Sequence, residues 1–140
     1  MIKEFKGEYR WLSNFAPVNI IRNCRSYPSV EHAFQSAKAH DPAWKRFCSD
    51  LRPAGEVKKA SRYVKLVSNW EEIKVGVMRR CLRQKFGQEP YRSKLKATGD
   101  KYIQEGNWWG DQFWGVCLKT DSGQNMLGEL IMEIRKEIQA

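Results

Sequence analysis

The sequence lacks a long apolar segment, a cysteine pair at metal-ligand spacing and more than two histidines. No stretch approaches the roughly 20 apolar residues that cross a bilayer, so we expect no membrane partner. The four cysteines lie far apart in the sequence, which indicates neither a zinc site nor a disulfide framework. No apolar segment follows the basic residues at the N-terminus, and we therefore expect a cytoplasmic protein. We expect no metal and no other cofactor.

Low-complexity tracts, internal repeats and linker-like segments rich in Pro, Gly or Ser are also absent. A chain of 140 residues holds one hydrophobic core, and we predict a single domain over residues 1–140. The net charge is +9, and residues 45–101 contain 16 Lys and Arg against 6 Asp and Glu. This excess favours anionic partners, either nucleic acid or a phosphorylated small molecule, although a solvated basic helix surface would give the same composition.

Apolar periodicity predicts mainly helices. Ser29 is a good N-cap for a helix over the following segment, and Pro42 after Asp41 starts another. The strongest helical periods cover residues 69–86 and 125–138. Short strands are predicted at residues 2–9, 18–22, 102–104 and 113–118. The predicted fold class is therefore α+β, a single compact helix-dominated domain with a few short strands.

The helix after Ser29 carries a polar face. Glu31, Gln35 and Lys38 follow i, i+4, i+7 spacing, while alanines and a phenylalanine occupy the other face. These polar side chains could point into one pocket, or they could form an ordinary solvated helix surface. His32 lies in the same segment, where a single histidine is more often structural than catalytic.

The segment WWGDQFWG, residues 108–115, gathers three tryptophans and a phenylalanine around one carboxylate, Asp111. Three interpretations are open: core packing, a platform that stacks a flat ligand, or the wall of a catalytic pocket. Asn125, just before the last predicted helix, has two interpretations. Its side chain could cap the helix, or the free N–H groups there could hold a phosphate. Local sequence does not choose between them.

Five motifs, which occur in the order typical of the family, resemble the NADAR family, also called YbiA-like. They cover nearly the whole chain, and their combination is far more specific than any one of them. The motifs are LSNF at 12–15, YPSVEHAFQSAK at 27–38, NW at 69–70 with KF at 85–86, D-x-FWG at 111–115 and GQNMLGELIMEIR at 123–135. One departure is visible: many relatives follow FWG with an acidic, glycine-rich stretch, where this chain has Val116, Cys117 and Leu118.

The resemblance implies an N-glycosidase, which cuts the bond between ribose and a nitrogenous base or amine. Family members act on phosphorylated ribosylamino-pyrimidine intermediates of riboflavin synthesis, or remove ADP-ribose from guanine in nucleic acid. Carried over by motif, the implied catalytic residues are Glu31, Trp70 and Asp111, and Lys38 is the position for which a Schiff base at ribose C1′ has been considered. The implied substrate-binding residues are Asn14, Phe15, His32, Gln35, Trp109, Phe113, Trp114, Gly115 and Asn125.

A two-carboxylate mechanism follows from this set. Cleavage develops positive charge on the ribose ring, and a carboxylate in a dry pocket walled by the tryptophans and Phe113 would stabilise it. We expect Glu31 and Asp111 to face one aromatic-walled cavity, with one stabilising the cation and the other acting as general acid or base. Two rival functions remain open: a non-catalytic module that binds ADP-ribose or nucleic acid, and a structural interaction protein.

Overall fold

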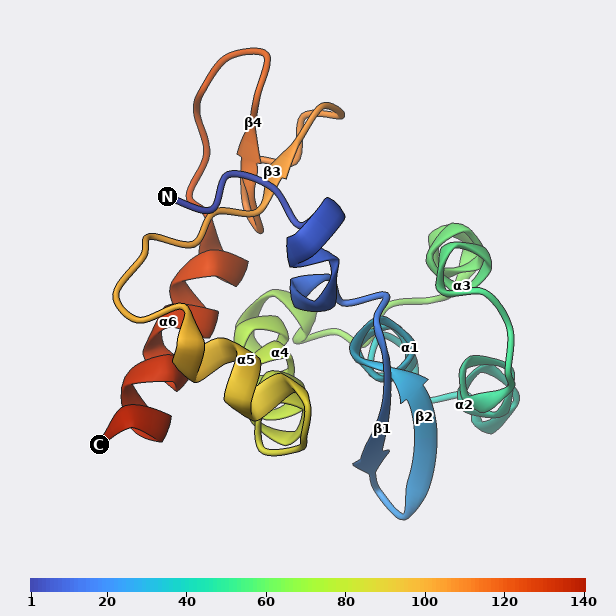
Figure 1. Ribbon diagram of the computed structural model, residues 1–140. Coiled ribbons are helices and arrows are strands. Elements are labelled where there is room, and N and C mark those ends of the chain that lie inside the picture. The colour runs from blue at the N-terminus through green and yellow to red at the C-terminus, as the bar shows by residue number, and fades with distance from the viewer. The chain divides into compact units, whose positions relative to one another are not determined.

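A computed structural model describes residues 1–140, and helices dominate it (Figure 1). The predicted α+β class is confirmed, since the strands are few and short. The chain divides into two compact units. Asn14–Lys85 is termed the hairpin unit, and Met1–Ser13 together with Phe86–Ala140 is termed the terminal unit. The helices lack the combination of length and apolar composition that a membrane crossing requires.

The hairpin unit begins with two antiparallel strands, β1 (Pro17–Arg22) and β2 (Arg25–Ser29). Asn23 and Cys24 join them with φ angles of 50° and 64°, the left-handed pair that a tight two-residue turn requires. Arg22 and Arg25 are therefore register partners at the closing end of the hairpin. β1 confirms the strand predicted at residues 18–22, whereas β2 has no counterpart among the predicted strands.

The helices of the hairpin unit are α1 (Val30–Ser36), α2 (Pro42–Ser49), α3 (Ala54–Ala60), the short 3-10 turn η2 (Ser61–Tyr63) and α4 (Trp70–Phe86). The predicted cap at Ser29 and the predicted helix start at Pro42 are confirmed, and Asp41 caps the second helix. Ser29 Oγ accepts from the His32 backbone N at 3.2 Å, and Asp41 Oδ1 accepts from the Ala43 backbone N at 2.9 Å. Such caps satisfy N–H groups that the first helical turn leaves unpaired. α4 agrees closely with the helix predicted at residues 69–86.

Apolar side chains from the strands and helices form the core of the hairpin unit. Ile20 of β1, Val30 of α1, Val57 of α3 and Val77 of α4 are each 0% exposed. Burial of such a side chain contributes about 1.5–3 kcal/mol. α1 contacts β1, β2, α2 and α3, so the helix that carries Glu31 is central to the packing of this unit.

The terminal unit contains η1 (Gly7–Leu12), α5 (Tyr91–Ala97), β3 (Gly106–Asn107), β4 (Val116–Cys117) and α6 (Met126–Gln139). β3 and β4 pair in parallel, and α5 packs on α6. Arg135 of α6 secures the segment after α5, because its Nη1 donates to Thr98 Oγ1 at 3.0 Å and to the Lys101 carbonyl at 2.8 Å. α6 confirms the helix predicted at residues 125–138.

Three strand predictions in the terminal unit are wrong in extent. The strand predicted at residues 2–9 is replaced by a single bridge from Ile2 to Ile103 and by the 3-10 helix η1, which begins at Gly7 with a φ of 58°. The strand predicted at 102–104 is reduced to that same bridge. The strand predicted at 113–118 is reduced to β4. Pairing partners distant in sequence, more than local alternation, set the extent of a strand.

Candidate active site

Glu31 is the second residue of α1 and is buried, with 7% of its surface exposed. Gln35, one turn later, is 3% exposed and donates from Nε2 to Glu31 Oε1 at 2.7 Å. The Glu31 backbone N donates to the Asn14 carbonyl at 3.0 Å, which ties α1 to the segment before β1. The polar face predicted for this helix therefore points inward at Glu31 and Gln35. For these two residues, the alternative of a solvated helix surface is wrong.

The two residues that bond Glu31 each have a buried side-chain oxygen without a hydrogen-bond partner: Asn14 Oδ1 and Gln35 Oε1. The Asn14 amide nitrogen is engaged, since Nδ2 donates to Met78 Sδ at 3.6 Å. An unpaired buried acceptor costs about 1–3 kcal/mol. Because each oxygen needs a donor, this pair is suited to hydroxyl or amine groups of a ligand.

The Lys38 side chain lies beside two aromatic rings. Its Nζ is 5.8 Å from the ring centroid of Phe34 and 5.9 Å from that of Trp70. The two rings pack on each other with centroids 5.2 Å apart. Trp70 is the first residue of α4 and is 7% exposed. It therefore anchors α4 on α1 and also forms one wall beside the Lys38 amine.

Burial lowers the pKa of Lys38, which increases the fraction of neutral amine at a given pH. The Glu31 carboxylate opposes this shift in pKa, whereas the ammonium groups of Lys58 in α3 and Lys74 in α4 add to it. Lys58 and Lys74, from separate segments, therefore act electrostatically on Lys38, which itself interacts with Glu31, although Lys74 also pairs with Glu71. Such a grouping of cations suits a ligand that carries a phosphate.

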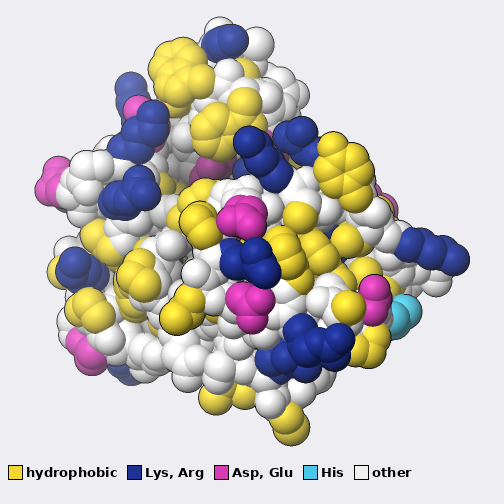
Figure 2. All heavy atoms as spheres, turned by 90° about the vertical axis from the view of Figure 1, so that its right-hand side faces the viewer, with side chains coloured by type: hydrophobic (Ala, Val, Ile, Leu, Met, Phe, Trp, Pro, Cys, Tyr) yellow, Lys and Arg dark blue, Asp and Glu magenta, His cyan; other side chains and the backbone are white.

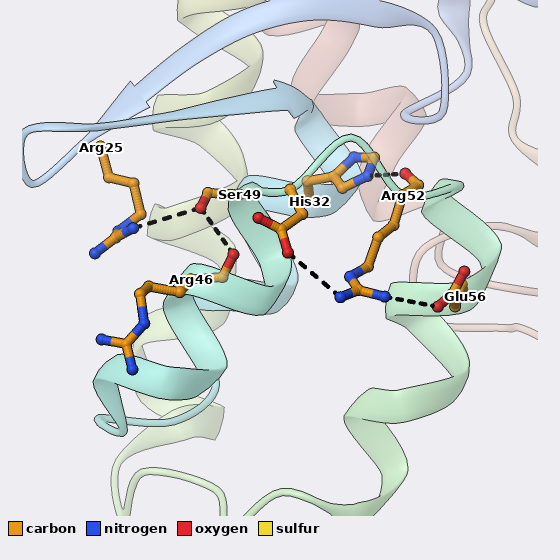
Figure 3. Close-up of polar contacts among 7 residues, drawn as sticks. Arg25, His32, Arg46, Ser49, Arg52 and Glu56 are labelled. Atoms are coloured by element: carbon orange, nitrogen blue, oxygen red, sulfur yellow. Dashed lines mark hydrogen bonds and ion pairs between the residues drawn. The ribbon is translucent and has the colours of Figure 1, made fainter.

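His32 is buried and uses both ring nitrogens within the protein, and Figure 3 shows the bond to Arg52. Nε2 donates to the Arg52 carbonyl at 2.6 Å, and Nδ1 lies 2.6 Å from Ser29 Oγ. Because a carbonyl oxygen only accepts, Nε2 carries a hydrogen. The Arg52 guanidinium in turn bonds Asp50 at 3.3 Å and Glu56 at 3.2 Å. His32 thus anchors the α2–α3 connection, as expected of a structural histidine, and its substrate contact stays a prediction.

Phe15 lies just before β1 and is 41% exposed. Its ring lies near the start of α3, because a Cβ added at Gly55 would be 4.0 Å from the ring. An exposed ring adjacent in sequence to Asn14 is compatible with the predicted substrate contact of Phe15.

Asp111 belongs to the terminal unit, where it closes a local turn. Its Oδ1 accepts from the backbone N of Phe113 at 3.1 Å and from that of Trp114 at 3.0 Å. Asn107 holds the same residue, since its Oδ1 accepts from Asp111 N at 3.0 Å and its Nδ2 donates to Asp111 O at 2.9 Å. Asp111 Oδ2 accepts no hydrogen bond from the protein. One oxygen is therefore structural, and the expectation that Asp111 faces Glu31 stays a prediction.

Trp108 and Trp109 do not wall a dry pocket. They are 50% and 65% exposed, which corrects the expectation that the tryptophans of this segment together exclude water. Phe113 and Trp114 are less exposed and pack edge to face, with ring centroids 4.9 Å apart. Of the three interpretations of WWGDQFWG, a platform that stacks a flat ligand agrees best with the two exposed indole rings.

Gly115 permits a close approach of the half-buried Glu105 carboxylate to the backbone. A Cβ at position 115 would lie 1.8 Å from Glu105 Oε2 and 2.2 Å from Glu105 O. Glu105 Oε2 also accepts from Asn107 Nδ2 at 3.2 Å. Glu105 is thus a second carboxylate beside the Asp111 turn. No sequence motif marks Glu105, and the requirement for glycine at position 115 is the feature of the sequence that reflects its presence.

The structure supports neither interpretation of Asn125. Its backbone is left-handed, with a φ of 54°, and its side chain makes no cap bond to α6. Oδ1 instead accepts from Glu105 N at 2.9 Å, and Nδ2 donates to Ile103 O at 2.9 Å. Backbone carbonyls take the N–H groups at the start of α6: Asn125 N bonds Gly115 O at 3.2 Å, Met126 N bonds Phe113 O at 3.0 Å, and Leu127 N bonds Trp114 O at 2.9 Å. These groups are therefore occupied and do not serve a phosphate.

No group of three or more His, Cys, Asp or Glu side chains is arranged to hold a metal ion. The cysteines are free thiols, and all except Cys24 are buried. Burial raises the pKa of Cys48 to about 12 and that of Cys81 to about 11. Both thiols are therefore protonated, and weak as nucleophiles, near neutral pH.

The sequence pattern described as the NADAR domain matches residues 2–139 of the chain. This chain belongs to the NADAR family. The resemblance drawn from the five motifs is thereby confirmed. Among relatives of this NADAR chain, N-glycosidase YbiA of Shigella boydii is 33% identical, over 94% of the chain and 82% of that protein.

Other relatives are longer than the NADAR chain. A riboflavin biosynthesis protein of Vibrio vulnificus is 33% identical over 92% of the chain, which spans 35% of that protein. The chloroplastic riboflavin biosynthesis protein PYRR of Zea mays is 29% identical over 90% of the chain, which spans 23% of it. The NMR structure of YbiA from Escherichia coli has the same fold, with a TM-score of 0.84, 30% identity, and coverage of 99% of this chain and 87% of YbiA.

Proposed function

We propose that this chain is an N-glycosidase that hydrolyses the bond between a phosphorylated or ADP-linked ribose and a nitrogenous base or amine. The observation that carries the proposal is the buried Glu31 carboxylate, which Gln35 holds beside the Lys38 amine and two unpaired acceptors. Similarity to proteins named N-glycosidase YbiA supports the same class of reaction. Two substrates fit: a ribosylamino-pyrimidine phosphate, or ADP-ribosylated guanine in nucleic acid.

Glu31 is the general acid or base in this proposal. As the glycosidic bond breaks, positive charge develops on the ribose ring, and the base departs with the bonding electrons and takes up a proton. A carboxylic acid can supply that proton, and the carboxylate so formed can accept one from the attacking water. Because Oε1 is held by Gln35 at 2.7 Å, Oε2 is the oxygen assigned to exchange protons with the substrate.

The two unpaired acceptors match the donors that a ribose ring carries. The Gln35 amide bonds the Glu31 carboxylate directly, and the Asn14 backbone carbonyl accepts from the Glu31 backbone N, so both residues adjoin Glu31. Ribose hydroxyls bound by Asn14 Oδ1 and Gln35 Oε1 would hold C1′ next to Glu31. A site with buried unpaired acceptors discriminates strongly against ligands that lack the matching hydroxyls. We therefore expect ribose to be preferred over deoxyribose at the cleaved bond.

Lys38 offers a covalent alternative at the same site. Its neutral amine, which the lowered pKa favours, would attack C1′ while the base leaves with the electron pair of the broken bond. Opening of the sugar ring would give a protonated imine between C1′ and Nζ. Water would then add to C1′ and release both the sugar and the free amine. Borohydride reduces an imine to a stable amine, so trapping of a protein–sugar adduct separates this route from direct hydrolysis.

The aromatic segment at residues 108–115 is proposed to bind the base. Stacking on an aromatic face contributes about 1–3 kcal/mol per base and tolerates different bases. Trp109, at 65% exposed, is the proposed stacking surface. Asp111 Oδ2, which has no donor within the protein, is proposed to stabilise the positive charge of the transition state.

The decisive experiment supplies the purified protein with ADP-ribosylated guanine in DNA and, in parallel, with a ribosylamino-pyrimidine phosphate. Freed bases are separated by chromatography, and a chelator in both arms tests whether the reaction is metal-independent. We expect release from at least one substrate, and its loss in Glu31→Gln and in Asp111→Asn with an unchanged unfolding transition. The exposed carboxylates in Glu8→Gln and Asp121→Asn provide matched controls that should keep full activity.

The results also separate the rival function. Ligand binding without base release by the unmutated protein would support a non-catalytic module and would refute the glycosidase. Undiminished release by Glu31→Gln would refute the assigned acid or base. Salt distinguishes the substrates, because log K for a nucleic acid falls by about 0.7–0.9 per neutralised phosphate for each unit of log salt. A small metabolite should show a much weaker dependence.

A further inference from the structure

The closing pair of the β1–β2 hairpin consists of two arginines, Arg22 and Arg25, which are register partners across the turn. Like charges directly opposite each other destabilise an antiparallel pair. Arg22 has a further cost, because its Nε is buried without a hydrogen-bond partner. A buried donor of this kind costs about 1–3 kcal/mol. An anion bound between the two guanidinium groups would relieve both costs.

Helix α2 places a third cation at the same position. Arg25 Nη1 donates to Ser49 Oγ of α2 at 3.4 Å, as Figure 3 shows. Lys45 precedes Ser49 by four residues and therefore lies on the same face of α2. Its Nζ donates to the Ser36 carbonyl at the end of α1, at 3.1 Å. The hairpin and α2 thus bring Arg22, Arg25 and Lys45 together.

The electrostatics agree with this geometry. Burial lowers the pKa of Lys45, and the positive charges of Arg22 and Arg25 lower it further. None of the three cations forms an ion pair, since the ion pairs of the hairpin unit involve Arg52 and Lys74. Figure 2 shows many Lys and Arg side chains on one face of the surface, some of them next to Asp or Glu. The cluster of Arg22, Arg25 and Lys45 is therefore a positive site without a protein counter-charge.

We propose that Arg22, Arg25 and Lys45 form a binding site for a phosphate group. Guanidinium groups bond two phosphate oxygens at once, and an ammonium adds a third charge-assisted bond. This site is distinct from the Glu31 site. Lys45 contacts Ser36 at the last turn of α1, five residues beyond Glu31, which corresponds to about 7 Å along the helix axis. The phosphate belongs either to a nucleic-acid backbone or to a free phosphorylated molecule.

The test is a binding measurement on the full chain with two probes, a fluorescent single-stranded 12-nucleotide DNA and inorganic pyrophosphate. The variant is Arg22→Gln with Arg25→Gln, and the matched control is Arg92→Gln with Lys96→Gln on exposed positions of α5, which loses the same net charge. We expect the hairpin variant to bind its probe about tenfold more weakly or worse, and the control to change by no more than about twofold.

The two probes separate the sources of the phosphate. Loss confined to the DNA arm assigns the site to a nucleic-acid backbone, and loss confined to the pyrophosphate arm assigns it to a free phosphorylated molecule. Equal loss in the variant and the control, or no binding of either probe by the unmutated protein, overturns the site. Because the double variant removes two like charges that face each other, its melting temperature should be no lower than that of the unmutated protein. If its melting temperature is lower, Lys45→Gln serves as a second variant. The measurement does not depend on glycosidase activity.

Discussion

Gln35→Met removes the side-chain hydrogen bond that holds Glu31. Methionine keeps the length and unbranched shape of glutamine, so the packing inside the hairpin unit should change little. Loss of a hydrogen bond to a charged group costs about 1.5–3 kcal/mol, whereas removal of the unpaired Oε1 recovers about 1–3 kcal/mol. The two contributions have opposite sign and similar size. We expect the free energy of unfolding to change by no more than about 2 kcal/mol.

Catalysis should respond very differently. Glu31 loses its fixed orientation and the ribose loses one acceptor, so we expect kcat/KM to fall about 10–100-fold, or about 1.4–2.7 kcal/mol of barrier. Base release and urea unfolding, measured in the same buffer, give both quantities. Gln139→Met, the same substitution at an exposed position near the end of α6, is the control and should leave both nearly unchanged.

A second variant distinguishes positioning from mere structural support. Gln35→Glu places another carboxylate one turn from Glu31, and repulsion between like charges should move the acid limb of the kcat/KM profile to higher pH. A residue that only supported the fold would lower the rate equally at every pH. A kcat/KM of Gln35→Met within about twofold of the unmutated value, or a loss of stability of more than about 3 kcal/mol, would refute this role of Gln35.

Other predictions concern stability and base binding. Burial lowers the pKa of Lys85 to about 7, so between pH 7 and 10 the folded chain binds fewer protons than the unfolded chain. The free energy of unfolding, measured by urea titration, should therefore rise by up to about 1.4 kcal/mol per pH unit, and Lys85→Met should abolish this slope. Gly115→Ala should lower stability by about 2 kcal/mol or more in thermal melts, because the added Cβ would overlap Glu105. Gly110→Ala is the control and should cost only about 1 kcal/mol, because position 110 has a φ of 86° but no atom within 4 Å of the added Cβ. Trp109→Ala should raise KM about 10–100-fold with little change in melting temperature, since the ring is proposed to stack on the base and is largely exposed. An unchanged KM would exclude stacking at Trp109.

Features with a local physical cause could be predicted from the sequence. The Ser29 cap and the helix from Trp70 to Phe86 depend on side chains a few residues apart, and both are confirmed. The inward direction of Glu31 and Gln35 could only be offered as one of two alternatives. Their spacing shows that they share a face, but which face is buried depends on β1, β2, α2 and α3.

Features that depend on distant partners could not be predicted. Asn125 resembles a helix cap in sequence, yet its side chain bonds Ile103 and Glu105, about 20 residues away. Carbonyls of residues 113–115 cap α6 in its place. Likewise, the positive cluster at the hairpin requires the register of Arg22 and Arg25, and no periodicity signals β2.

The bonds from residues 113–115 to the start of α6 divide the aromatic segment into two parts of unequal tolerance to change. Residues 113–115 bond the start of α6, whereas Trp108 and Trp109 precede that part and are 50% and 65% exposed to solvent. Protein engineering could therefore exchange these two side chains, or randomise them in a library, without disturbing the scaffold beneath. In the proposed glycosidase, this pair is the place at which the choice of base could be altered.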